Sequence, residues 1–191
     1  GTSPAGDSLS IESHRDDVLL LGGGWDLLVG HSLGGAIAAA AMAADPTVAA
    51  RVVLEDPAID SDVTARVLAS CPEPSLHPTI EAIAAEHPNW DPHDVELKVE
   101  ALLQCGPEVS ERTMKDASPW DTWPAVLAMP VPLLLLGADP VDSSLVTAAN
   151  GAEAVAANAN IEFVLVDGAG HSMHRDAYDR YWQLMRGFLE R

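Results

Sequence analysis

The chain contains four short apolar runs in which polar and apolar residues do not alternate regularly. They cover residues 25–29, 51–55, 132–137 and 161–166. Runs of this length and character are typical of strands that are buried on both faces of a parallel sheet. We therefore predict four buried strands, the first of which runs from Trp25 to Val29.

Helical patterns lie between these strands. Residues 11–21 are expected to form a helix that the glycines at 22–24 end, and residues 35–44 form an Ala-rich helix closed by Asp45 and Pro46. A third helical segment spans about residues 145–157. The last helix is amphipathic, with an apolar side that carries Tyr178, Trp182, Met185 and Leu189. Strands that alternate with helices predict an α/β fold with a mainly parallel sheet flanked by helices.

Residues 57–128 differ from the rest because prolines are frequent and the apolar pattern is helical. The clearest helix starts with Asp91 as its N-cap and Pro92 at its first position. We predict that 57–128 is a helical insertion and that residues 1–56 and 129–191 form the core.

A possible nucleophile occupies the turn between the first strand and the Ala-rich helix. Gly30-His31-Ser32-Leu33-Gly34 has the pattern G-x-S-x-G, and the strand–turn–helix context is the one that a nucleophile elbow requires. In such a turn Ser32 occupies strained backbone space, and Gly30 and Gly34 let the strand and the helix approach. The backbone N–H of Leu33 is then the first donor of an oxyanion hole. The alternative is that Ser32 only caps the helix.

Ser32 needs a base and a group that orients the base, and both follow later strands. Asp139 follows the third strand and His171 the fourth, which gives the order Ser32, Asp139, His171. Glu55 or Asp56, after the second strand, is an alternative acid. His174 and His31 are alternatives to His171.

The pieces V-G-H-S-L-G-G, L-L-L-L-G-A-D-P and G-A-G-H-S-M-H-R-D together resemble the α/β-hydrolase superfamily. The resemblance implies Ser32 as nucleophile, His171 as general base and then acid, Asp139 as the residue that orients His171, and residues 57–128 as a cap. It also implies a carboxylesterase, lactonase, C–C hydrolase or related acyl hydrolase without a cofactor or metal. We take His31, Trp120 and Met173 as candidates for substrate binding.

Composition narrows the partners. The net charge of −19, from 29 acidic and 10 basic residues, argues against nucleic acid and anionic membranes as partners. The two cysteines, Cys71 and Cys105, are too few for a disulfide framework, so we expect reduced thiols in a cytoplasmic protein. The alternative is one disulfide between them in a secreted chain. The expected substrate is a small molecule with an ester-like bond.

The resemblance also points to missing parts. The family places more strands before the elbow, together with a loop that gives the second oxyanion N–H, and no residue here matches that loop. The strand from Trp25 to Val29 would then lie at an open edge of the sheet, where a second copy or a partner chain can pair with it. The alternative to an active hydrolase is therefore a weak or inactive α/β-hydrolase-like scaffold that needs a partner for the missing strands.

Overall fold

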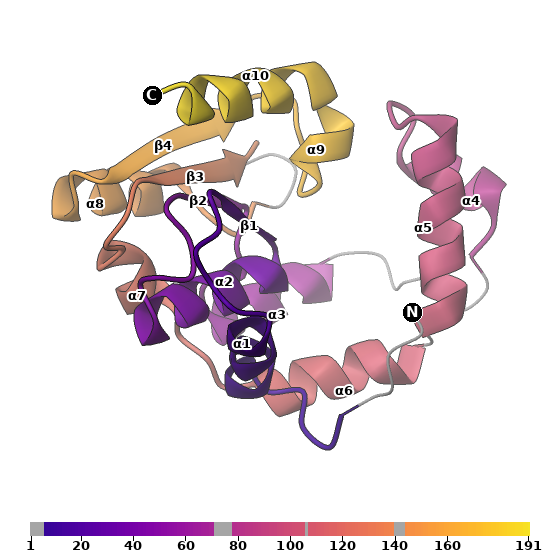
Figure 1. Cartoon of the computed structure of the whole chain (residues 1–191). Coiled ribbons are helices and arrows are strands. Elements are labelled where there is room, and N and C mark those ends of the chain that lie inside the picture. The colour runs from indigo at the N-terminus through magenta and orange to yellow at the C-terminus, as the bar shows by residue number, and fades with distance from the viewer. Residues whose placement is uncertain (1–5, 71–77, 106, 140–143) are drawn as a thin grey trace.

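A computed structural model of the chain describes residues 6–70, 78–105, 107–139 and 144–191. Within these residues, four parallel strands form one sheet in the order β1-β2-β3-β4 (Figure 1). Their bounds are β1 Leu28–His31, β2 Val52–Glu55, β3 Leu133–Ala138 and β4 Ile161–Val166. The predicted α/β fold with a parallel sheet is confirmed. The first strand lies later than predicted, and Trp25 forms only an isolated bridge with Ala49.

Helices cover both faces of this sheet. The Ala-rich helix α2 (Leu33–Ala44), with α7 (Trp123–Leu127) and α8 (Ala148–Ala157), lies on one face, and α10 (Tyr178–Leu189) lies on the other. In β2, Val52 and Leu54 pack into the first layer while Val53 packs into the second. Because successive side chains of a strand point to opposite faces, a strand buried on both sides must be apolar throughout.

The helices before and after the sheet differ from the prediction in detail. Helix α1 (Ile11–Leu20) packs against α2 and is capped by Ser10, whose hydroxyl accepts the N–H of Ser13. On α10 the buried side carries Tyr181, Met185 and Phe188. The predicted apolar side was therefore wrong for Tyr178, Trp182 and Leu189, which are exposed. The predicted and the observed buried residues both fit helical spacing, and packing against the sheet determines which of them are buried.

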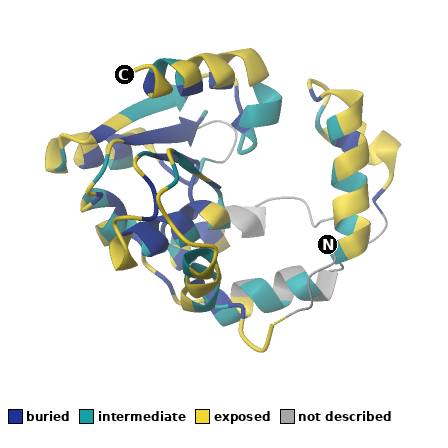
Figure 2. Cartoon of the chain, in the orientation of Figure 1, coloured by how far each residue is buried: buried dark blue, intermediate teal, exposed yellow. Residues whose placement is uncertain are grey.

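The segment predicted as a helical insertion contains five helices in its described part. They are α3 (Ser61–Ser70), α4 (Ile80–Glu86), α5 (Pro92–Cys105), α6 (Pro107–Ala117) and α7. Helix α5 begins at Pro92 as predicted. Helices α4 and α5 stand away from the sheet, pack on each other through Ile83, Trp90 and Val95, and are otherwise largely exposed (Figure 2). Ile59 and Val126, near the ends of the segment, instead belong to the core of the sheet.

No helix within the described ranges has the length and apolar character that crossing a bilayer demands. Cys105 is a free, half-buried thiol, and Cys71 lies outside the described residues.

Candidate active site

Ser32 lies at the turn between β1 and α2 in a backbone conformation that few residues other than glycine adopt. Its φ is 54° and its ψ is −124°, and its hydroxyl does not cap the helix. Non-glycine residues are held in such strained conformations mainly at functional sites. This geometry agrees with the predicted elbow and not with the alternative of a helix cap.

Two glycines make the turn sterically feasible. A Cβ at Gly30 would lie 2.5 Å from the carbonyl oxygen of Gly34, and one at Gly35 would lie 2.5 Å from Cβ of Pro57. A Cβ at Gly34 would meet nothing within 4 Å. The close approach that we expected at Gly30 is present. The second one belongs to Gly35 and not to Gly34.

The elbow is hydrogen bonded directly to the end of β2. The Ser32 N–H donates to the carbonyl oxygen of Glu55 at 3.0 Å, and the Ser32 carbonyl oxygen accepts the N–H of Ala58 at 2.9 Å. The backbone on either side of Asp56 is therefore fixed to Ser32. Among the described residues, the N–H of Leu33 has no recorded backbone acceptor, as expected for the first residue of a helix. It stays available for the predicted oxyanion role.

His171 is paired with Asp56. Its Nδ1 lies 2.7 Å from Oδ2 of Asp56, whose side chain is fully buried, while 38% of the His171 side chain is exposed. With Nδ1–H donating to the carboxylate, Nε2 is the ring nitrogen that carries the free lone pair. This is the arrangement in which a buried acid fixes the tautomer and orientation of a general base.

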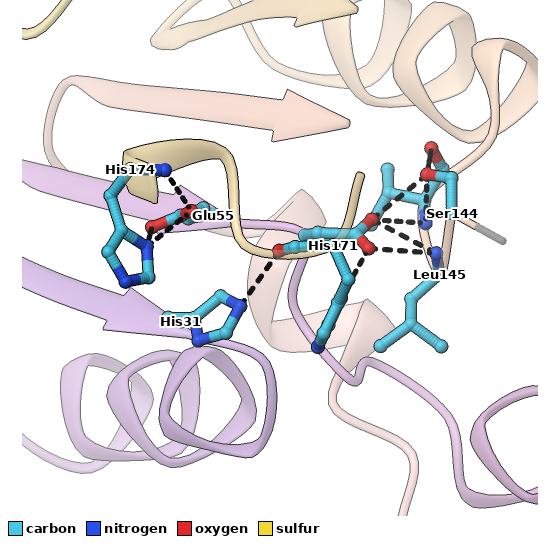
Figure 3. Close-up of polar contacts among 8 residues, drawn as sticks. His31, Glu55, Ser144, Leu145, His171 and His174 are labelled. Carbon is cyan, nitrogen blue, oxygen red and sulfur yellow. Dashed lines mark hydrogen bonds and ion pairs between the residues drawn. The ribbon is translucent and has the colours of Figure 1, made fainter. Parts of the chain in front are cut away.

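The Asp56 carboxylate is held from its other side by residues that follow β3. Oδ1 accepts the Ser144 hydroxyl at 2.9 Å, the Leu145 N–H at 3.0 Å and the Val146 N–H at 3.1 Å (Figure 3). Asp56 itself has a positive φ of 37°. A buried carboxylate with this many donors is rigid, and it directs its remaining oxygen to His171.

This pairing differs from the expected Asp139–His171 pair and follows the alternative acid position after the second strand. Oδ2 of Asp139 accepts the N–H of Gly168 at 3.1 Å, and the Asp139 N–H donates to the carbonyl oxygen of Ala169 at 2.9 Å. Asp139 therefore holds the backbone of the loop that leads to His171. Asp56 is closer in the fold to Ser32 because β2 is the direct neighbour of β1.

A second histidine–carboxylate pair lies beside the first. His174, on α9 (Met173–Asp176), places Nδ1 2.8 Å from Oε1 of Glu55. His31 is close to both pairs, and its Nε2 lies 2.9 Å from the carbonyl oxygen of His171 (Figure 3). Burial, more than any other cause, lowers the pKa of His31, so its ring is neutral near pH 7 and donates Nε2–H to that oxygen. The sequence indicates Glu55, His174 and His31 as alternative site residues, but it does not predict that they contact one another.

Two of the three candidates for substrate binding are buried. Met173 is fully buried among the residues that pack under α10, so it presents no surface to a substrate. Trp120 is buried with Ile11 and Ala36, and its Nε1–H donates to the carbonyl oxygen of Ala58 at 2.6 Å. Apolar side chains with no periodic signal are packed into the core wherever space allows. His31 is the candidate that lies at the site.

Residues 1–184 match the Alpha/beta hydrolase family. No curated protein sequence matches the chain. Similar solved structures include the N-formylmaleamic acid deformylase of Pseudomonas putida S16, at 20% identity and a TM-score of 0.75, covering 97% of this chain and 77% of that one.

Two further structures are similar over the whole chain. E-2-(acetamidomethylene)succinate hydrolase is 23% identical with a TM-score of 0.72, and it covers 100% of this chain and 77% of its own. The enol-lactonase of Burkholderia xenovorans LB400 is 22% identical with a TM-score of 0.73, at the same two coverages of 100% and 77%. At these identities the similarity shows the fold.

Proposed function

The chain belongs to the α/β hydrolase family, and from that premise we propose that it is a serine hydrolase that cleaves an ester or a related acyl bond through Ser32, His171 and Asp56. The observation that carries the proposal is the 2.7 Å contact between Nδ1 of His171 and Oδ2 of the buried Asp56. It accompanies the positive φ of Ser32 at the turn between β1 and α2.

The reaction follows from these groups. Nε2 of His171 takes the proton of the Ser32 hydroxyl as Oγ attacks the acyl carbon, and the N–H of Leu33 donates to the developing oxyanion. His171 then gives the proton to the leaving group, which leaves an acyl-enzyme on Ser32. Water, activated by His171, hydrolyses that ester and frees Ser32. Asp56 stays ionised and holds the imidazole in one orientation throughout.

The names of similar solved structures support an acyl substrate, because they include a deformylase and an enol-lactonase. Those names cover both amide and ester bonds. We propose an ester or lactone as the substrate of this chain, because a hydroxyl leaving group needs less help from the acid than an amine does. We also propose that α4 and α5 form part of a cap over the site.

A fluorophosphonate probe tests the nucleophile. We expect one phosphonyl adduct per chain, located on the peptide of Ser32 by mass spectrometry and absent from Ser32→Ala. Turnover of nitrophenyl esters of increasing chain length, compared with the matching nitroanilides, then separates ester from amide specificity. Folded protein without an adduct would instead support an inactive scaffold with this fold.

We also propose that β1 pairs with a second copy or with a partner chain. Within the described residues β1 pairs only with β2, and Val29 on that edge is 44% exposed, with the exposed Leu20 and Leu21 preceding it in the chain. An apolar open edge favours strand pairing between chains. Light scattering should show association that Val29→Glu weakens, and a clean monomer at high concentration would contradict the proposal for a second copy.

A further inference from the structure

The Glu55–His174 pair has no part in the reaction proposed above, yet it is built as completely as the Asp56–His171 pair. Glu55 is 1% exposed. Its Oε1 accepts both Nδ1–H and the backbone N–H of His174, at 2.8 and 3.0 Å, and its Oε2 lies 3.0 Å from the same Nδ1. A buried carboxylate costs stability unless it is fully paired. Its presence at this position therefore calls for a role.

Tyr181 of α10 closes the other side of Glu55. Burial, the negative charge of Glu55 and a hydrogen bond with its carboxylate raise the pKa of Tyr181 to about 12. The ring of Tyr181 also lies edge-on to that of His174, with their centroids 6.2 Å apart. Glu55 is thus buried between His174 and Tyr181, and the half-buried His174 ring contacts both.

His31 joins this pair to His171. The centroid of its ring lies 4.6 Å from that of His171 and 5.3 Å from that of His174 (Figure 3). Because the His31 ring is neutral, its Nε2–H is a fixed donor to the carbonyl oxygen of His171. Within the described residues these histidines and carboxylates form no group that could hold a metal ion. The contacts between them are therefore hydrogen bonds and ring packing.

The loop that carries His171 is consequently held from two different strands. His31, at the end of β1, holds the carbonyl oxygen of His171, and Glu55, at the end of β2, holds both the ring and the backbone of His174, three residues later. These contacts fix the main chain around His171. The Asp56 contact alone fixes only its ring.

We propose that Glu55, His174 and His31 are positioning residues that hold His171 at the distance from Ser32 that proton transfer needs. The proposal rests on the proposed function, in which Ser32 is the nucleophile. A displacement of about 1 Å in a reacting group can cost on the order of 10²-fold in rate. The loss should fall on kcat and on Ser32 phosphonylation, and not on KM, because the three side chains act on the reaction through His171. A loss that falls on KM in His31→Leu would contradict the positioning role of His31 and support its predicted role in substrate binding.

The test uses paired substitutions in the full chain. Glu55→Gln/His174→Leu removes the pair without leaving a buried charge, whereas His174→Asn keeps an N–H donor near the place of Nδ1. His31→Leu removes the donor to His171, whereas His31→Gln keeps one near the place of Nε2. His14→Asn is the matched control, because His14 lies on α1, outside both the site and the proposed cap.

We expect Glu55→Gln/His174→Leu and His31→Leu each to lower kcat for a nitrophenyl ester about 10- to 100-fold, with KM changed less than threefold. His174→Asn and His31→Gln should recover most of the loss, and His14→Asn should behave as wild type. The downfield NMR resonance of the proton shared by His171 and Asp56 should shift or broaden only in the two apolar variants.

Retention of kcat within twofold of wild type in both apolar variants, with an unchanged downfield resonance, would overturn the proposal. An equal loss in the apolar and the conservative variants would also contradict it, because the donors would then not be what matters. If one apolar variant does not fold, the other decides, since His31 and His174 lie on different elements. If wild type takes no phosphonyl adduct, the proposed function fails, and the NMR comparison still tests how His171 is held.

Discussion

The carboxyl ends of β2 and β3 each present an acid, and the two acids have different surroundings. At the end of β2, Asp56 is fully buried and bonds to His171, Ser144, Leu145 and Val146. At the end of β3, Asp139 is half-buried and accepts the N–H of Gly168 in the loop before His171. Parallel strands end at one edge, so both acids reach the same loop, but Asp56 holds the ring and Asp139 holds the main chain.

For the proposed nucleophile Ser32, an acid on the neighbouring strand β2 has an advantage over an acid on β3. Ser32 bonds to the backbone of Glu55 and Ala58, on either side of Asp56. The acid on β2 is therefore fixed relative to the nucleophile by main-chain contacts, whereas β3 lies one strand further away.

The largest effect is expected on catalysis. Asp56→Asn should lower kcat for a nitrophenyl ester on the order of 10³- to 10⁴-fold, because the amide no longer stabilises the imidazolium or fixes its tautomer. Asp139→Asn should lower it at most about tenfold, because Oδ2 of Asp139 accepts the Gly168 N–H of the loop before His171, a contact that the Asn oxygen can also make. Steady-state kinetics of the two purified variants checks this, and a larger loss in Asp139→Asn would reverse the assignment.

The same two acids should differ in stability. Asp56→Ala leaves the N–H of Leu145 and the His171 ring without their acceptor, and each buried donor left unpaired costs about 1–3 kcal/mol. The Val146 N–H keeps Oγ of Ser144 as an acceptor at 3.3 Å. We expect a loss of about 3 kcal/mol in the free energy of unfolding, and a clearly smaller loss for Asp139→Ala. Urea denaturation measures both. Equal losses would mean that the Asp56 network is not the more rigid one.

Alkaline pH tests the packing around Glu55, on the other side of the β2 end. The pKa of Tyr181 is raised to about 12 in the folded state, against about 10 when it is exposed. Between these values the unfolded chain loses its proton first, so wild type loses stability as pH rises from 10 to 12. Tyr181→Phe should lack this part of the decline in urea titrations. Parallel curves for the two proteins would contradict the contact with Glu55.

Acidic pH tests His31, and the effect should be the smallest. Because its pKa is lowered in the folded state, the unfolded chain binds the proton more readily once pH falls through about 6.5. Wild type should therefore lose stability relative to His31→Gln between pH 7.5 and 5, with a constant difference above 7.5. A difference that does not change with pH would mean that His31 is not buried as a neutral ring.

Much of the fold could be predicted from the sequence, because its signals are local. The four strands follow from unbroken apolar runs, the start of α5 from Asp91 and Pro92, and the elbow from the glycines around Ser32. Each of these depends on residues that are close in sequence, so the pattern itself contains the physical cause.

The choice of acid could not be made in this way. Asp56 is held in contact with His171 by its positive φ and by hydrogen-bond donors at residues 144–146, about ninety residues later in the chain. Nothing in the local sequence at Glu55-Asp56-Pro57 or at Asp139-Pro140 separates the two acids. Trp120 and Met173 were hard to place for a related reason, because an apolar side chain fits a substrate pocket or the core equally well until the packing is known.

Whether Asp56 and His171 activate Ser32 can be measured as the rate at which a fluorophosphonate probe labels the Ser32 peptide. The rate is compared in wild type, Asp56→Asn and Asp139→Asn at pH 7.5. We predict rapid labelling of wild type, labelling of Asp139→Asn within about tenfold of that rate, and labelling of Asp56→Asn at least 10²-fold slower. Equal rates in wild type and Asp56→Asn, or an adduct on a residue other than Ser32, would contradict it.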